Sequence, residues 1–332
     1  MESPVIIVGA GLSGLVAANA LQAAGRQTMV IDKGRSAGGR LATRRLNASA
    51  GGSTRFARVD HGAQFFTVRS PDFAELVHDW RRAGLLMEWC RGFSSEGDGY
   101  PRYCAEGGMN TIAKYLASTL DVRTETTIHA IAGGDGALSV LAASGERWES
   151  NQIVTTAPVP QSLALIDNGW LAIEEAVRCK LDAVKYAKCI ALLVSLDGPS
   201  SVAEPGGMQF DESTNAVWSF VGDNFRKGIS DIPAVTFHAN ELFSEEHYDD
   251  DEADLRAALL EAAGPFLGAA LPTSVDVKKW RYARPTVLHA DRCVTTNPLE
   301  DTTLVFCGDA FGEARVEGAA LSGLAAAEAL LR

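Results

Sequence analysis

The first residues of the chain alternate between short apolar runs and a longer stretch with apolar residues at helical spacing. The apolar run 5–8 leads into a glycine-rich segment, and an alanine- and leucine-rich stretch follows over 12–24. A second apolar run, 28–31, ends at Asp32. This order predicts a strand, a tight turn, a helix and a second strand, with Gly25 as the stop of the helix.

The C-terminal end has a similar pattern of strand, turn and helix. Residues 304–307 form an apolar run, Gly308 and Asp309 follow, and a helix of small residues is predicted to begin near Val316. Both ends of the chain therefore predict strand-to-helix turns of the kind found in α/β folds.

The middle of the chain contains more strands than helices. Helices are predicted at 71–83, 111–120 and 249–263, and a β-rich meander at 122–131, 137–143, 147–149 and 153–156. Further strands are predicted at 184–196, 217–220, 234–238 and 275–282. Several strands joined without long helical segments indicate an antiparallel sheet.

Composition limits the classes of partner. The chain has 332 residues, of which 46% are hydrophobic, so it can bury a sizeable core. A net charge of -12 without any run of Lys and Arg argues against nucleic acid and against an anionic membrane surface. No apolar run is long enough to span a bilayer, and glycines interrupt the apolar residues 4–18, unlike a signal peptide.

The six cysteines form no CxxC pair. A redox dithiol and a metal site are therefore not expected, and reduced thiols favour a cytoplasmic location. No second GxGxxG motif occurs in the middle of the chain, so a separate nicotinamide domain is not expected either.

The N-terminal glycine motif has the spacing of a dinucleotide fingerprint. Gly9 permits the tight turn, Gly11 permits close approach of a pyrophosphate, and Gly14 permits close packing of the helix on the strand. Free N–H groups at the helix start face the negative charge, and Asp32 can accept hydrogen bonds from a ribose. The residues predicted to contact the dinucleotide here are Gly9, Ala10, Gly11, Leu12, Ser13, Gly14, Asp32 and Lys33.

Three further segments identify the dinucleotide by resemblance. The Gly38–Arg40 turn, the segment Asp60–Phe66 and the closing sequence CGDAFGEARVEGA resemble the FAD-binding flavoproteins of the amine oxidase and renalase-like group. The resemblance implies non-covalent FAD, with the pyrophosphate near Gly39 and Arg40. It implies that Gly62, Ala63, Gln64 and Phe65 lie along the flavin ring, that backbone groups of Thr127 and Ile128 meet the adenine, and that Gly308, Asp309 and Val316 meet the ribityl chain and the pyrimidine edge.

The same resemblance implies a fold and a division into domains. The fold class is α/β, with a Rossmann-type FAD-binding domain and a smaller α+β substrate domain built on an antiparallel sheet. The FAD-binding domain is expected at 1–70, 102–160 and 283–332, and the substrate domain at 71–101 and 161–282. Cys307 and His61 are expected to be buried structural residues.

The chain is most similar to the bacterial renalase group, which implies an FAD-dependent oxidoreductase and an oxidase. The implied reaction oxidises 2- or 6-dihydro isomers of NAD(P)H by hydride transfer to flavin N5, with O2 as acceptor and H2O2 as product. The positioning of the substrate accounts for most of the catalysis in such a reaction, so no catalytic base is assigned. Candidates for orienting the substrate are Arg315, Phe65, Trp218 and Tyr282.

Two alternatives remain open. A flavin-containing amine oxidase acting on a small amine often has a lysine that positions water near N5, and Lys185 and Lys279 are available for this role. A flavin-dependent isomerase or desaturase is the second alternative.

Overall fold

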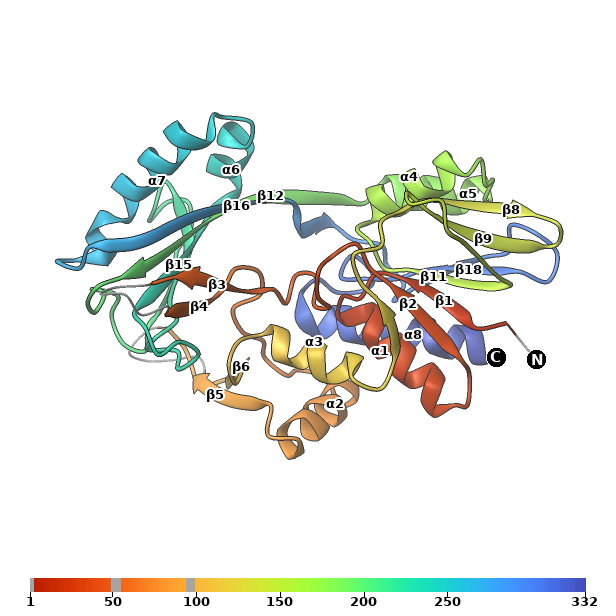
Figure 1. Ribbon diagram of the computed structural model, residues 1–332, viewed down its shortest axis with the longest axis horizontal. Coiled ribbons are helices and arrows are strands. Elements are labelled where there is room, and N and C mark those ends of the chain that lie inside the picture. Colours follow the sequence, from red (N-terminus) through yellow and green to blue (C-terminus); the bar gives the residue numbers. More distant parts are fainter. Residues whose placement is uncertain (1–2, 49–54, 94–98) are drawn as a thin grey trace.

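The computed structural model describes residues 3–48, 55–93 and 99–332. Figure 1 shows two units, joined by the long strands β12 (Lys185–Leu196) and β16 (Pro272–Val287). Both ends of the chain lie in the same unit. The α/β fold with a nucleotide-binding unit and a second unit on an antiparallel sheet is therefore confirmed.

The first unit is built on a six-stranded sheet of order β17-β18-β11-β1-β2-β7, in which every pair is parallel except β17 with β18. Its elements are β1 (Val5–Val8), α1 (Leu12–Ala23), β2 (Thr28–Ile31), α2 (Pro71–Arg82), α3 (Asn110–Ala117), β7 (Asp121–Arg123), β8 (Ile128–Gly134), β9 (Ala137–Ala142), β10 (Arg147–Ser150), β11 (Gln152–Thr155), α4 (Val159–Asn168), α5 (Glu175–Asp182), β17 (Val294–Thr296), β18 (Thr303–Phe306) and α8 (Arg315–Leu331).

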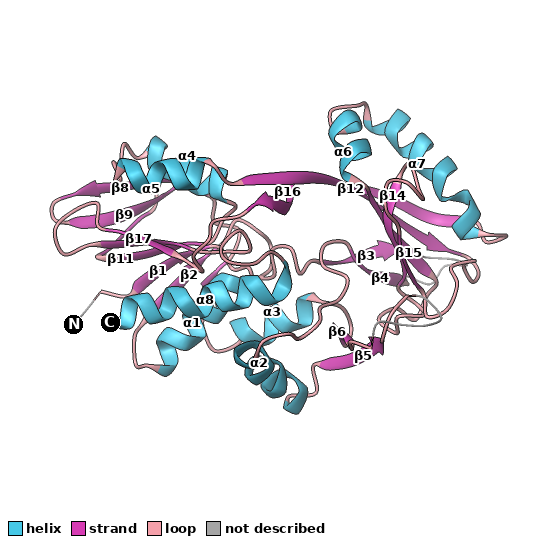
Figure 2. Ribbon diagram, turned by 180° about the vertical axis from the view of Figure 1, so that it is seen from behind, coloured by secondary structure: helices cyan, strands magenta, loops and turns pink. Residues whose placement is uncertain are grey.

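Both faces of this sheet are covered, as the fully apolar strands require. Val5 and Ile7 of β1 point to a cluster formed with α1, α2, α3 and α8. Ile6 and Val8 point the other way, to the meander β8–β10 and to α4 and α5. The alternation along β1 thus contributes to two cores. Figure 2 shows α1 and α8 on one side of the sheet and α4, α5, β8 and β9 on the other.

Helix α8 packs against α1 at backbone distance. A Cβ added to Gly323 would lie 2.3 Å from the carbonyl oxygen of Ser13, and one added to Gly14 would lie 2.1 Å from the carbonyl oxygen of Gly9. Real Cβ atoms do not come so close, so these contacts need glycine. The contact fixes the two ends of the chain against each other.

The second unit is built on a five-stranded antiparallel sheet of order β13-β14-β15-β12-β16. One face packs on α7, and the other face is covered by the β3–β4 hairpin, through Leu46 and Val59. The remaining elements are β3 (Thr43–Asn47), β4 (Phe56–Asp60), β5 (Leu86–Cys90), β6 (Arg102–Ala105), β13 (Gly207–Gln209), β14 (Trp218–Asp223), β15 (Ala234–Ala239), α6 (Glu241–His247) and α7 (Glu252–Leu267).

Most predicted elements are present, with changes at their ends. The predicted helix at 249–263 begins at Glu252, because Asp251 caps it by accepting from the amide of Ala253 at 2.8 Å. The predicted strand at 275–282 extends over 272–287 because β12 pairs with it along its length. The helices α4, α5 and α6 were not predicted.

The packing differs from the predicted domain boundaries in several places, including the β3–β4 hairpin, which was predicted within 1–70 but covers the sheet of the second unit. Trp80 of α2 belongs to the same apolar cluster as β1, and Leu163 of α4 and Leu181 of α5 belong to the cluster on the other face of the sheet. The prediction assigned 71–101 and 161–282 to the substrate domain. We propose instead that α2, α4 and α5 belong to the first unit, because they share its core.

Within the described ranges, we find no helix that combines the length and the apolar character needed to cross a membrane.

We expect Gly323→Ala to destabilise the protein and Gly264→Ala not to. Both glycines are helical, but a Cβ on Gly264 meets no heavy atom within 4 Å. The first variant should lose about 1–3 kcal/mol of unfolding free energy through overpacking. The second should change it by less than about 1 kcal/mol, because the clash of a Cβ with the following Pro265 offsets the helix propensity of alanine. Urea unfolding measures both, and equal effects of the two substitutions would contradict the close packing of α8 on α1.

Candidate functional site

The β1–α1 turn is shaped for a ligand at the helix start. Gly9 has φ +112, and a Cβ there would lie 2.3 Å from Oγ1 of Thr156. Gly11, the N-cap of α1, has open space where its Cβ would be, and no side chain of the described part of the chain caps the helix. The N–H groups of the first turn are thus available to an anion.

Asp32, at the end of β2, is held by backbone groups. Its carboxylate accepts from the amide of Ala10 at 2.7 Å and from the amide of Gly34 at 2.6 Å. Lys33 beside it is exposed. The carboxylate therefore lies directly beside the glycine turn, as a ribose acceptor requires.

The segment leading into β8 lies beside Asp32. The amide of Thr126 donates to the carbonyl of Asp32 at 2.9 Å, and the amide of Glu125 donates to the carbonyl of Gly34 at 2.8 Å. The carbonyl of Thr127 accepts from the amide of Ala143 at 2.8 Å and is thus used by the meander. The structure brings Thr127 and Ile128 to this edge of the site, and their contact with adenine stays a prediction.

Arg40 and Asp309 form an ion pair that the sequence did not predict. Nη1 and Nη2 of Arg40 donate to the two carboxylate oxygens of Asp309 at 2.5 and 2.7 Å. Nη1 also donates to the carbonyl of Tyr282 at 3.2 Å. Burial raises the pKa of the Asp309 carboxyl, and the Arg40 guanidinium partly offsets this. One guanidinium thus joins the N-terminal loop, the C-terminal turn and β16.

The C-terminal turn is fixed by its own helix. The amide of Gly308 donates to Oγ of Ser322 at 2.8 Å, and Val316 is buried in the first turn of α8. No side chain of the described residues caps α8. Arg315 is exposed and has φ +94, a strained conformation for a residue with a side chain. Its role in orienting substrate stays a prediction.

Cys307 lies at the end of β18 with 1% of its surface exposed. Burial raises the pKa of its thiol, which therefore stays protonated at neutral pH. The prediction of a buried structural thiol is confirmed.

The segment after Asp60 lies against the Arg40 loop. A Cβ on Gly62 would lie 2.1 Å from the carbonyl of Arg40, and the amide of Ala63 donates to that carbonyl at 2.8 Å. Gln64 is buried, and its Nε2 donates to the carbonyl of Asp60 at 2.7 Å. The backbone of this segment therefore passes beside the nucleotide turn.

Phe65 enters a cluster of aromatic rings between the two units. The ring centroids of Trp89, Phe93 and Phe220 lie 6.2, 5.3 and 6.3 Å from that of Phe65. The guanidinium of Arg102, which is buried, lies 4.7 Å from the ring centroid of Phe93 and 5.4 Å from that of Phe65. Of the residues in this cluster, the sequence indicated only Phe65, because the others come from separate strands and loops.

Two histidines lie beside this segment. His61 stacks on Trp280 with ring centroids 5.3 Å apart, and the ring of His238 lies 6.0 Å from that of Phe220. Burial lowers the pKa of His61 to about 3 and that of His238 to about 4, so both rings are neutral at pH 7. His61 is buried, and its structural role stays a prediction, whereas His238 was missed.

The prediction that Trp218 walls the substrate site is wrong. Its side chain is 1% exposed and packs 4.9 Å from the ring of Phe237, and Nε1 donates to the carbonyl of Ala262 in α7 at 3.1 Å. Trp218 is therefore a core residue on the helix-covered face of the sheet. A register shift between Trp218 and Phe220 breaks the alternation along β14, so that Trp218 and Val221 both face this core, which the sequence alone did not reveal.

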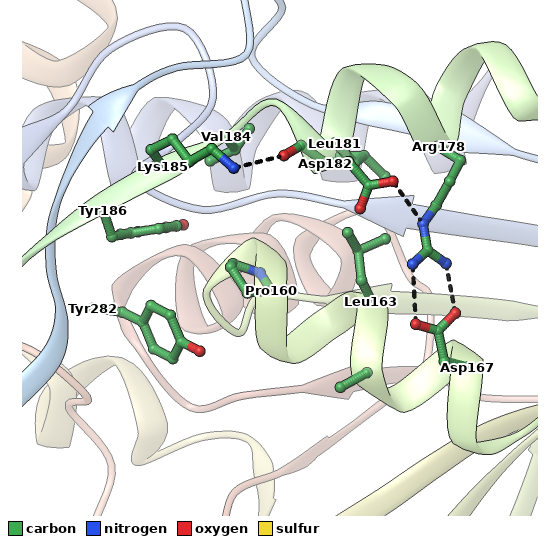
Figure 3. A pocket seen from close by; sticks show the side chains of 11 residues that line it. Pro160, Leu163, Asp167, Arg178, Leu181, Asp182, Val184, Lys185, Tyr186 and Tyr282 are labelled. Carbon is green, nitrogen blue, oxygen red and sulfur yellow. Dashed lines mark hydrogen bonds and ion pairs between the residues drawn. The ribbon is translucent and has the colours of Figure 1, made fainter.

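Tyr282 and Lys185 line a separate hollow of about 450 Å³ between α4, α5 and the long strands (Figure 3). The ring of Tyr282 packs edge-on against Tyr186 at 5.5 Å, and Nζ of Lys185 donates to the carbonyl of Asp182 at 3.3 Å. Nζ of Lys279 donates to carbonyls of Tyr248 and Asp250. Neither lysine belongs to the aromatic cluster around Phe65.

These features fit FAD. The open space at Gly11, the uncapped start of α1 and the carboxylate of Asp32 suit a pyrophosphate and its ribose. The uncapped start of α8 suits the negative charge of a reduced flavin. The residues that would hold the group come from both ends of the chain.

Comparison with known proteins decides the family. A model of the NAD(P)-binding Rossmann-like domain matches residues 7–80, and a model of flavin-containing amine oxidoreductases matches residues 79–331. The chain belongs to the flavin-containing amine oxidoreductases. It is therefore an FAD-dependent oxidoreductase.

Solved structures share the fold of this amine oxidoreductase at low sequence identity. Putrescine oxidase bound to putrescine is similar, with 17% identity, a TM-score of 0.74 and 100% of each chain covered. Cyclohexylamine oxidase from Brevibacterium oxydans has 13% identity, a TM-score of 0.71 and the same coverage. A fatty acid isomerase from P. acnes has 11% identity, a TM-score of 0.66 and coverage of 100% of this chain and 98% of its own.

We expect Arg40→Lys to weaken FAD binding by about tenfold or more, because lysine cannot reproduce the forked contact with Asp309. Titration of the apoprotein with FAD, followed by flavin fluorescence, measures the dissociation constant. Arg147→Lys is the control, since Arg147 pairs only with Glu149 on the surface of β10. An unchanged constant for the first variant would show that the fork is dispensable.

We expect stability to fall on acidification through the buried histidines. Their folded pKa values of about 3 and about 4 lie below the unfolded value, so their contribution is complete above pH 6.5 and is lost as pH falls. Between pH 7 and pH 5 each costs about 2 kcal/mol of unfolding free energy. Urea unfolding at both pH values should show a smaller difference for His238→Asn, whereas a change at the exposed His129 should leave it unchanged.

Proposed function

We propose that this FAD-dependent oxidoreductase oxidises 2- or 6-dihydro isomers of NAD(P)H to NAD(P)+. The observation that supports this most is the cluster of Phe65, Trp89, Phe93 and Phe220 with the buried guanidinium of Arg102 among its rings. Flat rings at these distances suit a planar dihydropyridine. The cluster adjoins the segment that the family resemblance places along the flavin.

The charge of this region also favours a dinucleotide over an amine. Arg102 brings a buried guanidinium among these rings, and such a group suits an anionic dinucleotide better than an ammonium substrate. A dihydronicotinamide dinucleotide has a neutral ring and an anionic pyrophosphate. Arg315, exposed at the start of α8, could supply a further cation for such a substrate.

The low basicity of the histidines agrees with a reaction that needs no base. His61 and His238 have pKa values lowered to about 3 and about 4, so both are weak proton acceptors. Loss of a hydride from the dihydropyridine forms an aromatic cation directly, so positioning carries the catalysis. When bound, FAD accepts the hydride at N5 and passes two electrons to O2, which takes up two protons and leaves as H2O2.

An amine oxidase is the second candidate, and the aromatic cluster supports it as well. Such an enzyme often has a lysine near the flavin, and Lys185 and Lys279 both donate to carbonyl groups away from the cluster around Phe65. A flavin-dependent isomerase or desaturase is the third candidate, and it would bind FAD through the same residues. The substrate experiment separates all three.

We also propose a cytoplasmic location. All six cysteines lie in the described part of the chain, and none forms a disulfide. Unpaired thiols in this number suit a reducing compartment.

Anaerobic reduction of the purified holoenzyme tests the substrate. We expect the flavin band to bleach rapidly with the NADH isomers made by borohydride reduction of NAD+, and not with ordinary NADH or a panel of small amines. Readmission of O2 should restore the band and release H2O2. Bleaching by an amine alone would replace this proposal with the amine oxidase, and no bleaching by either would favour an isomerase.

A further inference from the structure

Asp60, the residue before the flavin-lining segment, is the most highly connected polar residue of the boundary between the units. Every polar atom of Asp60 is hydrogen-bonded. Oδ1 accepts from Oγ1 of Thr43 at 2.6 Å and from the amide of Met109 at 2.8 Å, both in the first part of the chain. The carbonyl accepts from Nε2 of Gln64 at 2.7 Å.

The other partners of Asp60 come from the sheet of the second unit. Nζ of Lys227 donates to Oδ2 at 2.6 Å, Oγ1 of Thr236 donates to the carbonyl at 2.8 Å, and the amide of Asp60 donates to Oδ1 of Asn224 at 3.2 Å. The side chains of Asp60 and Lys227 are 0% exposed. The second unit thus holds Asp60 by hydrogen bonds to its amide, its carbonyl and its carboxylate.

The turn that carries Lys227 is itself fixed. Oδ1 of Asp223 accepts from the amides of Phe225 and Arg226 at 2.9 and 3.0 Å, and its Oδ2 accepts from Oγ of Ser200 at 2.6 Å. The amide of Lys227 donates to the carbonyl of Asp223 at 2.9 Å. The backbone that carries the Lys227 side chain is therefore fixed by hydrogen bonds.

We propose that Lys227 is a positioning residue, which acts through Asp60 to set the place of residues 61–65 against the isoalloxazine ring of FAD. The segment is anchored at two points: Asp60 is held by the sheet, and Ala63 is held by the carbonyl of Arg40. The turn that contains Arg40 fixes the anchor at Ala63, and the second unit fixes the anchor at Asp60. The substrate sheet thereby determines where the ring-lining backbone lies.

A buried ion pair suits this role better than apolar packing does. Removing its partners from water is costly, and apolar residues of similar volume often give equal or higher stability. Hydrogen bonds to both carboxylate oxygens allow only one arrangement of Asp60, whereas apolar contacts allow several. Since neither side chain is exposed, the pair acts on the cofactor through the backbone and not by touching it.

The test uses the absorption and fluorescence of bound FAD in three variants. Lys227→Met removes the hydrogen bond and leaves Asp60 as a buried, unpaired carboxylate. The double variant Asp60→Asn with Lys227→Met removes the bond without leaving a buried unpaired charge, and so avoids the largest energetic cost of the single variant. Lys188→Met is the matched control, because Lys188 pairs with Glu245 at 2.8 Å between β12 and α6.

We expect the double variant to keep FAD and the thermal stability of the parent apoprotein. Its flavin band should nevertheless lose fine structure, its flavin fluorescence should rise, and the KM for the reducing substrate should increase several-fold. Lys188→Met should keep the parental spectrum. A parental flavin spectrum in the double variant would overturn the proposal, since it would show that the ion pair only stabilises the fold. The spectral readout uses no substrate and is independent of the proposed reaction.

Discussion

The close packing of α8 on α1 is the constraint on which the rest of the structure depends. Gly323 allows α8 to meet the backbone of Ser13, and Gly14 allows α1 to meet the backbone of Gly9. These contacts bring the C-terminal turn beside the N-terminal one, so that two uncapped helix starts share one region. A ligand with a phosphate at one end and an electron-accepting ring at the other can then use both. Side chains at these glycines would separate the helices.

Two ion pairs, one partly and one fully buried, extend this arrangement to the second unit. Arg40 with Asp309 joins both chain ends to β16, and Asp60 with Lys227 joins the segment after β4 to the antiparallel sheet. Ion pairs of this kind add little net stability, because the cost of desolvation offsets the attraction. Their hydrogen-bond geometry instead restricts how the two units meet. The aromatic cluster around Phe65 lies at the same boundary, so its shape depends on that restriction.

Sequence patterns predicted the elements of the first unit well. The strands β1, β2 and β18 and the helices α1 and α8 begin and end within a few residues of their predicted bounds, because apolar runs and glycine turns are local signals. The helices α4 and α5 were missed, since their apolar faces become regular only against the meander. Trp218 was misassigned because a register shift between it and Phe220 breaks the alternation of the strand, and the sequence pattern does not mark that shift.

The sequence by itself determined a dinucleotide-binding turn, because the glycines at 9, 11 and 14 and the carboxylate of Asp32 each meet a local steric or charge requirement, and its resemblance to a known family specified FAD. The tertiary structure alone decided which residues gather around Phe65. Arg102, Phe220 and His238 come from distant strands, and Lys227 reaches Asp60 across 167 positions of the chain. No local pattern encodes such contacts, because burial and register set them only when the two units meet.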